Sequence, residues 1–472
     1  MLGIGLRLRG KRVAVIPVLV VAGAVGVLGV TSASAASGSP SATYAANAAK
    51  ATNASNTTSA KANSGEAVSG LRQQVAAGTL LRTHGVRAVC GHCDAEVVTT
   101  STSSKTPLSA SQPAGYGPAS LAAAYDLPSK STSTATIAII DAGVDGRLAS
   151  DLATYRSTYG LPACTVASGC LKLENYTGGA QPAPQRSGLG AYTEEQVGVE
   201  TSLDLDAASA ACSTCHLLEI SVPWQDGNDD NDVSTNDFAT AVNTAVAAHA
   251  SVVSISYGYT TDVTNTSGFD LAAFRHKGVA ITVSTGDNGF NGGIHQAWPS
   301  DLPTVVAVGG VTLPTSAKGK ATAWYDAGSG CETDFRAATG QPAAVTAACG
   351  GHRAAADVSA DADPATGLAV YDTYAPSTDQ PGDWMIIGGT SASAPYIGAL
   401  FARTGHLAAV DGPNTLYAAP AADFTDITSG NNEAFQTCAQ FQDQDVSKKL
   451  CNAGAGWDGP TGIGVPHGLG AF

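Results

Sequence analysis

One serine in this sequence has surroundings that suit a nucleophile. Residues 388–395 read Gly-Gly-Thr-Ser-Ala-Ser-Ala-Pro, after two isoleucines and before a run of helical character. Small residues around Ser391 let a substrate approach its hydroxyl, and a helix that begins there directs N–H groups and its positive end to the same point. A serine that only caps a helix is the alternative. We interpret the complete string as a nucleophile site.

A serine nucleophile needs a base, and the nine histidines supply no obvious one. In subtilisin-type sites Gly-Thr follows the histidine, and no histidine here has that continuation. Asp141-Ala142-Gly143 resembles only the aspartate part of such a site. We therefore expect a carboxylate to act as the base.

Glu200 and Asp204 form the best candidate pair of carboxylates. They lie four residues apart in a helix expected over residues 193–211, which places both on one face. Two carboxylates this close raise each other's pKa and can share a proton. A solvated acidic helix face is the alternative.

A third acid, Asp287, lies in the turn Ser-Thr-Gly-Asp-Asn-Gly over residues 284–289, directly after an apolar run. An acid at the carboxyl end of a strand in an open α/β sheet is well placed for catalysis. An ordinary Asx turn is the alternative.

These residues need a scaffold in which strand ends and helix starts meet. Short apolar runs alternate with Ala-rich helical stretches from about residue 115 onward. The expected strands are 135–140, 217–222, 252–256, 279–284 and 305–308, and the expected helices are 193–211, 237–250, 269–276 and 391–404. This alternation predicts the α/β class, with a doubly wound, mostly parallel sheet.

The composition excludes two classes of protein. The 472 residues are 44% hydrophobic and only 13% charged, which is too apolar for a globally disordered chain. The 24 Lys and Arg against 39 Asp and Glu give a net charge of −15, so nucleic-acid binding through a basic surface is not expected. A monomer is the default expectation.

The first 36 residues have the pattern of an export signal. Basic residues precede an apolar run over residues 13–30, and Ala-Ser-Ala follows as a cleavage site. An uncleaved membrane anchor is the alternative. We expect cleavage, an extracellular protein and no lasting membrane association. Residues 37–110 are expected to be a low-complexity leader, a short propeptide or an N-terminal extension, and residues 111–472 the folded domain.

The ten cysteines are even in number, which in an exported chain predicts disulfides. Local spacing favours three loops, closed by Cys164–Cys170, Cys331–Cys349 and Cys438–Cys451. The other four form two Cys-x-x-Cys units, Cys90 with Cys93 and Cys212 with Cys215. For these units the sequence leaves open structural bridges, a shared four-thiolate zinc site and, at Cys90-Gly-His-Cys93, redox chemistry.

As a set, these motifs resemble the sedolisin family of serine-carboxyl peptidases, which share the subtilisin fold. The helical acid pair, the Ser-x-Gly-Asp-x-Gly turn and Gly-Thr-Ser-Ala-Ser-x-Pro occur in the order seen in that family. Ser-Ile-Ser-Tyr-Gly at 254–258 and Trp-Pro-Ser at 298–300 are similar too, and residues 117–128 look like the family's catalytic-domain start. The resemblance covers about residues 115–472.

The resemblance implies a role for each candidate. Ser391 would attack the peptide carbonyl, Glu200 would take its proton and Asp204 would hold Glu200 in place. Asp287, protonated, would donate to the oxyanion together with the Ser391 N–H. The resemblance thus implies a secreted endopeptidase that acts on proteins or peptides, and carboxyl groups in place of a histidine imply an acid pH optimum.

The resemblance also implies one Ca²⁺ ion near the C-terminal end. Asp426 and Asp458 would give carboxylate oxygens, and Ile427, Gly454 and Gly456 would give backbone carbonyls. Hard oxygen ligands suit this ion. A plain Gly-rich terminus is the alternative.

Two other functions stay open. One is a catalytically silent secreted binding domain on the same fold, and the other is a disulfide exchanger that uses Cys90 and Cys93. A folded propeptide of the size usual in the family is not recognisable before residue 111.

Overall fold

The computed structural model describes residues 86–88, 93–99, 101–103, 112–184, 189–223, 235–258, 270–294, 297–314, 319–373, 384–434, 437 and 445–472. The predicted signal segment and most of the predicted leader lie outside these ranges. Within them, no helix has the length and apolar character that crossing a membrane requires.

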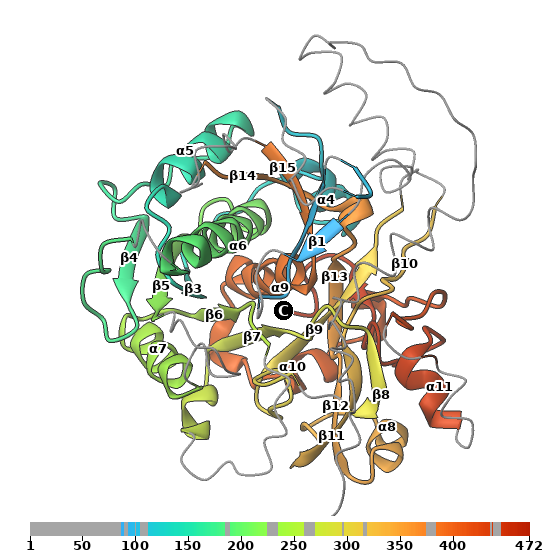
Figure 1. The fold of residues 1–472 in the computed structure, drawn as a ribbon. Helices are drawn as coiled ribbons and strands as arrows, with labels where there is room; N and C mark the ends of the chain where they lie inside the picture. Colours follow the sequence, from blue (N-terminus) through green and yellow to red (C-terminus); the bar gives the residue numbers. More distant parts are fainter. Residues whose placement is uncertain are drawn as a thin grey trace, which may run out of the picture. The chain divides into compact units, whose positions relative to one another are not determined.

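An eight-stranded sheet forms the centre of the described fold (Figure 1). The strand order is β10-β9-β7-β6-β3-β5-β4, and β13 pairs with β9 as well. The strands are β3 (Thr136–Ala142), β4 (Leu171–Asn175), β5 (His216–Val222), β6 (Val252–Ile255), β7 (Ala280–Ser284), β9 (Val306–Thr312), β10 (Thr322–Ala323) and β13 (Val358–Asp361). All pairings are parallel except that of β10 with β9, which confirms the predicted sheet.

The central strands read as apolar runs because both of their faces are covered. In β6 and β7 every residue is buried, and in β3 only the first is not. Parallel strands with helices on their faces lack the alternation of a half-exposed sheet. The five expected strands correspond to β3, β5, β6, β7 and β9, with ends that shift by a few residues.

Eight α-helices are described in the same ranges. They are α4 (Pro118–Ala124), α5 (Leu148–Thr158), α6 (Leu189–Ala211), α7 (Thr235–Ala247), α8 (Ala343–Ala348), α9 (Thr390–Thr404), α10 (Asn414–Tyr417) and α11 (Asp445–Cys451). Three expected helices correspond to α6, α7 and α9. The expected helix 269–276 is wrong: a short 3₁₀ turn, η1 (Leu271–Phe274), stands there. Arg275 is extended and Gly278 has a φ of 80°, so the chain turns into β7 before a second helical turn can form.

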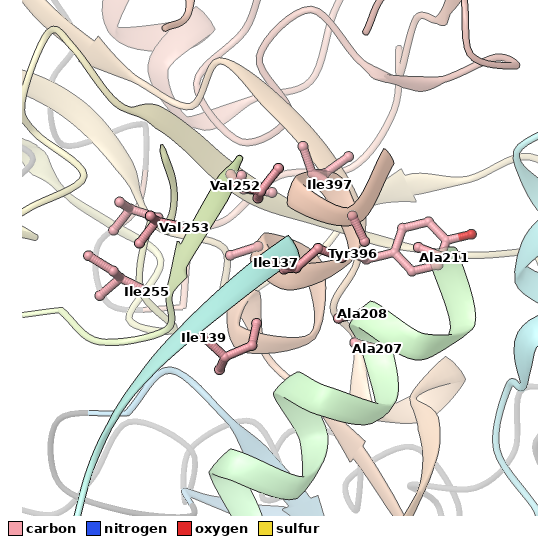
Figure 2. Packing of buried hydrophobic residues seen from close by; sticks show 14 of the residues in the cluster. Ile137, Ile139, Ala207, Ala208, Ala211, Val252, Val253, Ile255, Tyr396 and Ile397 are labelled. Carbon is pink, nitrogen blue, oxygen red and sulfur yellow. The ribbon is translucent and has the colours of Figure 1, made fainter. Parts of the chain in front are cut away.

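Helices α6 and α9 lie against each other and against the central sheet (Figure 1). Figure 2 shows Ala207, Ala208 and Ala211 of α6 beside Tyr396 of α9, with Ile137 of β3 in the same buried cluster. Small alanine side chains let the two helices approach closely. α9 also packs on β6, β7, β9 and β13, so it covers the middle of the sheet.

A second sheet joins the N-terminal segment to the strand before α9. Its order is β1 (Val86–Ala88), β2 (Glu96–Val98), β15 (Trp384–Gly388) and β14 (Leu368–Tyr371), and all its pairs are antiparallel. β1 and β2 belong to the segment that the sequence predicts as a leader or extension. Two smaller sheets contain β8 (Phe290–Ile294), β11 (Ser329–Arg336) and β12 (His352–Ala355), and β16 (Phe424–Thr425) with β17 (Val465–Pro466).

The described cysteines are all disulfide-bonded. Cys164–Cys170 and Cys331–Cys349 confirm two of the predicted loops. Cys93 and Cys451 are bonded as well. Cys90 and Cys438 lie outside the described residues, so the predicted Cys438–Cys451 loop stays a prediction.

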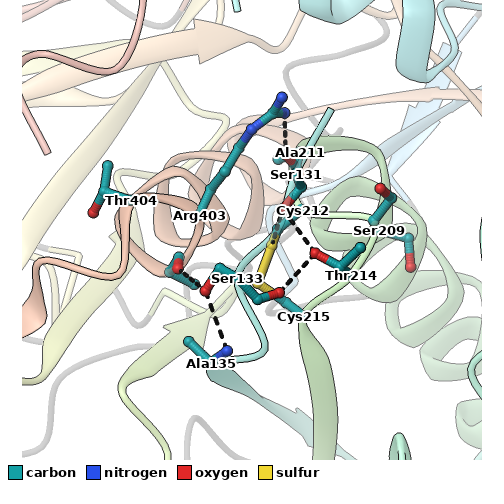
Figure 3. Close-up of a disulfide and its surroundings, with 12 residues drawn as sticks. Ser131, Ser133, Ala135, Ser209, Ala211, Cys212, Thr214, Cys215, Arg403 and Thr404 are labelled. Atoms are coloured by element: carbon teal, nitrogen blue, oxygen red, sulfur yellow. Dashed lines mark hydrogen bonds between the residues drawn. A yellow bond between two sulfur atoms is a disulfide. The ribbon is translucent and has the colours of Figure 1, made fainter. Parts of the chain in front are cut away.

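Cys212 and Cys215 are bonded to each other, which removes these thiolates from the zinc site considered above. This bridge closes the turn between α6 and β5 (Figure 3). Nearby, Arg403 near the end of α9 donates a hydrogen bond from Nη1 to the Ala211 carbonyl at 2.6 Å. The last turns of α6 and α9 are therefore tied together.

Candidate active site

The acid pair of α6 lies in the interior of the fold. Glu200 and Asp204 are both 0% exposed, so the alternative of a solvated acidic face is wrong. Asp204 accepts a hydrogen bond at Oδ2 from Ser256 Oγ at 2.7 Å. Its Oδ1 and both oxygens of Glu200 have no hydrogen-bond partner among the described residues. Buried carboxyl oxygens without partners are costly when charged, which favours the protonated form.

The environment raises the pKa of both carboxyls well above their usual values. For Glu200 burial is the main cause, the charges of Asp204 and Asp141 add to it, and the nearby Ser391 hydroxyl lowers it. For Asp204 burial again dominates, Asp141 adds, and the hydrogen bond from Ser256 lowers the pKa. The pair therefore keeps a proton to higher pH than exposed carboxyls would, and can both accept and return one.

Ser391 is the second residue of α9, directly after the turn that leaves β15. Its side chain is buried, and Oγ donates to the Ser256 carbonyl at 3.3 Å. Pro395 has no N–H to bond the carbonyl four residues earlier, which frees the carbonyl of Ser391. Ser256 Oγ lies 3.4 Å from that oxygen. Ser256 thus contacts both Ser391, the nucleophile candidate, and Asp204 of the acid pair.

The approach to Ser391 requires glycine at position 389. Gly389 has a φ of 104°, in the region that favours glycine. A Cβ there would lie 2.2 Å from the Asp94 carbonyl oxygen and 2.6 Å from Asp287 Oδ2. The absence of a side chain at Gly389 therefore makes room for the Asp94 carbonyl and the Asp287 carboxyl beside Ser391.

Asp287 lies at the carboxyl end of β7, beside the start of α9. Its Oδ1 accepts hydrogen bonds from the N–H and the hydroxyl of Thr390, both at 2.8 Å. Its Oδ2 is buried and has no partner among the described residues. Burial raises the pKa well above its usual value, the charges of Asp94 and Glu96 add, and Thr390 lowers it. The unpartnered Oδ2 is the atom that would carry a proton and donate it.

Three residues near this cluster were not in the predicted catalytic set. Ser256 lies in Ser-Ile-Ser-Tyr-Gly at 254–258, a motif that resembles the family and has no predicted catalytic role. Asp141, considered only beside a histidine, ends β3 with both oxygens unpartnered among the described residues, and burial raises its pKa to about 7. Asp94 has no local sequence signal, because only the pairing of β2 with β15 brings it here.

The predicted calcium residues meet in one region near the C-terminal end. The N–H groups of Gly456 and Gly454 donate to Oδ2 of Asp426 and Oδ2 of Asp458, each at 2.9 Å. Burial is the main cause that raises the pKa of Asp458 to about 7, and the charge of Asp426 contributes.

The donor set of this region suits a hard cation. The carbonyls of Ile427, Gly454 and Gly456 accept no backbone hydrogen bond from the described residues. Carboxylate and carbonyl oxygens are the ligands that Ca²⁺ takes. The described ranges contain no group of three or more His, Cys, Asp or Glu that could hold a metal ion by itself, so carbonyls or water would have to complete the shell here.

Comparison with known proteins points to one superfamily. The model of the subtilase family of peptidases matches residues 197–416, a range that contains Glu200, Asp204, Asp287 and Ser391. The structure of Pseudomonas sedolisin, a serine-carboxyl proteinase complexed with pseudo-iodotyrostatin, is similar with a TM-score of 0.57 at 23% identity. The similarity covers 75% of this chain and 96% of that chain, and it shows a shared fold.

Two relatives match at the level of sequence. Kumamolisin from Bacillus sp. (strain MN-32) is 30% identical over 391 residues, which cover 76% of this chain and 63% of the relative. Sedolisin from Pseudomonas sp. (strain 101) is 27% identical over 401 residues, which cover 76% and 60%. This chain thus spans less than two thirds of the length of either relative.

Proposed function

We propose that the chain is a serine-carboxyl endopeptidase of the sedolisin family that cleaves proteins at acid pH, which its similarity to kumamolisin and sedolisin supports. One observation carries the proposal. The buried Asp204 connects through Ser256 to the helix start where Ser391 lies, and the equally buried Glu200 lies one helical turn before Asp204 in α6.

The first half of the reaction forms an acyl-enzyme. Ser391 Oγ attacks the carbonyl carbon of the substrate, and Glu200 takes the hydroxyl proton. Glu200 then returns this proton to the leaving amine. Asp204, fixed by Ser256, shares a proton with Glu200 and keeps its carboxyl oriented. Water hydrolyses the ester in the second half, with the same pair acting as base and then acid.

The negative charge on the carbonyl oxygen needs donors. The N–H of Ser391 is one, and the protonated Oδ2 of Asp287 is the other. Thr390 holds the opposite carboxyl oxygen, so Oδ2 is already oriented when charge develops. One such donor typically contributes a factor of about 10²–10³ in rate.

Activity is expected to be greatest at acid pH and to fall as the pH rises through the raised pKa values of the site. Asp287 must be neutral to donate, and the acid pair must hold a proton. Above those pKa values all three groups lose their protons.

Cleavage of a denatured protein, followed from pH 2.5 to 8, measures this profile. Folding is checked at each pH by far-UV circular dichroism, so that loss of activity is not mistaken for unfolding. A maximum above pH 7 in folded protein would contradict the roles given to Asp287 and the acid pair.

We also propose that Asp426, Asp458 and the carbonyls of Ile427, Gly454 and Gly456 hold one Ca²⁺ ion. The ion would fix the C-terminal loops and take no part in the reaction. Removing it with a chelator is expected to lower the melting temperature by several degrees, since a ligand at 100 times its Kd stabilises a fold by about 2.7 kcal/mol.

Melting curves with and without EDTA, and after Ca²⁺ is restored, measure that effect. The Asp458→Asn variant should lose most of the response to Ca²⁺. An exposed control, Asp411→Asn, should keep it. Equal melting temperatures of the wild type with and without Ca²⁺ would contradict the site.

The disulfides support an extracellular location, where such bonds persist. Proteins and peptides are the substrates, and the enzyme acts as a monomer. Size-exclusion chromatography with light scattering tests the last point.

A further inference from the structure

A pocket lies at the edge of the central sheet opposite the candidate active site. Its volume is about 580 Å³, and its lining residues fall within 274–281, 303–304, 337–339 and 409–414. The first two segments lead into β7 and β9, so the pocket lies at the amino ends of these neighbouring strands (Figure 1). Asp287 follows the carboxyl end of β7. The five residues of that strand therefore separate the pocket from the site by roughly 16 Å.

Close contacts between the segments fix the walls of this pocket. Gly412 has a φ of 52°, and a Cβ there would lie 2.6 Å from the Thr304 carbonyl oxygen. The Gly278 N–H donates to the Val410 carbonyl at 3.3 Å. The chain around residues 410–412 is thus held against the segments that enter β7 and β9. The pocket is therefore part of the packed fold.

The charged side chains of the pocket are mostly basic. Arg275 and Lys277 line it on either side of His276 in the chain, and both are exposed. Among the described residues, none of these three side chains has a hydrogen-bond or ion-pair partner. Asp411 is the one acid in the lining, and its Oδ2 accepts a hydrogen bond from Asn414 Nδ2 at 3.1 Å. The pocket thus carries a local positive charge on a chain whose net charge is −15.

These groups suit a ligand with several carboxylates. The guanidinium of Arg275 can bond a carboxylate with two N–H groups, and the ammonium of Lys277 adds a second cation. The hydroxyls of Thr304 and Thr339 also line the pocket and have no partner among the described residues. A single ion would fill little of the volume, because pockets of about 300–1,000 Å³ enclose organic ligands. A short stretch of peptide with acidic side chains matches both the charge and the size.

We propose that this pocket binds an acidic segment of the protein substrate, with Arg275 and Lys277 paired to its carboxylates. The inference rests on the proposed function and adds a substrate feature that lies away from the cleaved bond. Five extended residues span roughly 16 Å, so the acidic segment must be at least that far along the chain from the bond. A path over the surface of the protein needs more residues.

An anchor of this kind acts on substrate binding and not on the chemical step. Binding at two linked places raises the effective concentration of the substrate at the second place. The contacts in the pocket are the same before and during the reaction, so they lower KM and leave kcat unchanged. The expected signature is therefore a KM that depends on acidic residues far from the cleaved bond.

A binding measurement tests the pocket without catalysis. Fluorescence anisotropy follows a labelled peptide of eight aspartates on the full chain with Ser391→Ala, at pH 5 and low salt. A peptide of eight asparagines is the reference and should bind at least tenfold more weakly. Arg275→Glu/Lys277→Glu should weaken binding of the acidic peptide at least tenfold. Arg275→Gln/Lys277→Gln, which adds no negative charge, should weaken it several-fold.

Lys130→Glu/Lys172→Glu is the matched control. Both lysines are exposed and lie outside the pocket, and the variant has the same net charge as the double glutamate variant of the pocket. It should change the Kd of the acidic peptide less than twofold. Melting curves confirm that each variant is folded. Equal binding of the two peptides, or equal loss in the control, overturns the inference.

A second measurement links the pocket to cleavage. A fluorogenic peptide that the wild type cuts is joined through a Gly/Ser linker of 15 residues to a tail of eight aspartates or eight asparagines, at either end in separate substrates. With the tail at one of the two ends, the aspartate tail should lower KM at least fivefold and leave kcat within twofold, and Arg275→Glu/Lys277→Glu should abolish this difference. Equal KM values for both tails at both ends overturn the inference and leave the proposed function standing. Pocket-dependent binding without any Ser391-dependent cleavage overturns the proposed function instead.

Discussion

The Ser391→Ala variant is expected to lose about 10⁴–10⁶ in kcat on a denatured protein at pH 4. Removing Oγ removes the atom that forms the acyl-enzyme, whereas the rest of the site stays in place. The lost hydrogen bond runs to the Ser256 carbonyl at 3.3 Å and is weak, so the fold should persist. Single-turnover assays at saturating substrate, with melting curves alongside, measure both effects.

Ser393→Ala is the matched control. Ser393 lies two residues further in the same helix and is equally buried, but its Oγ donates to the Asp361 carbonyl at 3.0 Å. Its loss should cost about 1 kcal/mol of stability and leave kcat within a small factor. If the wild type and Ser391→Ala were equally inactive while folded and loaded with Ca²⁺, the binding-domain alternative would replace the peptidase.

The Glu200→Gln variant is expected to lose about 10²–10⁴ in kcat, because an amide can neither take nor return the serine proton. The same change should alter stability in a way that depends on pH. The folded-state pKa of Glu200 is raised, so the wild type loses stability as the pH rises from the unfolded value of about 4.3 through the raised value. The amide does not ionise, so the variant should melt higher than the wild type at pH 7 and close to it at pH 3.

Glu219→Gln separates the two effects. Glu219 is a buried acid of β5, and burial and the charge of Asp141 raise its pKa too. Its Oε2 accepts a hydrogen bond from Gln181, and it has no part in the proposed reaction. This control should share the pH-dependent rise in melting temperature and retain activity. A Glu200→Gln enzyme with more than a tenth of wild-type kcat would show that another group is the base.

The catalytic candidates were predictable because each lies in a local pattern that the fold preserves. The acid pair needs only a helix at residues 200–204, and Ser391 needs only a strand followed by a helix. The buried parallel strands appear in the sequence as apolar runs, since both of their faces are covered. Where the local signal was weak, as at residues 269–276, the expected helix proved to be a single 3₁₀ turn.

The place of the N-terminal segment could not be predicted in the same way. Residues 93–98 contain no motif that indicates a place in the active site. The Cys-x-x-Cys unit at residues 90–93 indicates thiol chemistry or a disulfide instead. Their place depends on the register between β2 and β15, strands almost 300 residues apart in the chain. Pairing over such a distance leaves no periodicity in either strand.

The position of α9 late in the chain determines when the protein can complete its fold during synthesis. The helix covers β6, β7, β9 and β13, yet it is encoded after all four of them. A nascent chain that ends before residue 390 cannot bury the middle of its sheet, so it lacks a complete core. The proposed nucleophile, Ser391, lies on the same helix that completes the core, and β15, the partner of β2, is made directly before that helix. A partly made chain is therefore expected to lack the proposed peptidase activity, which needs the complete fold.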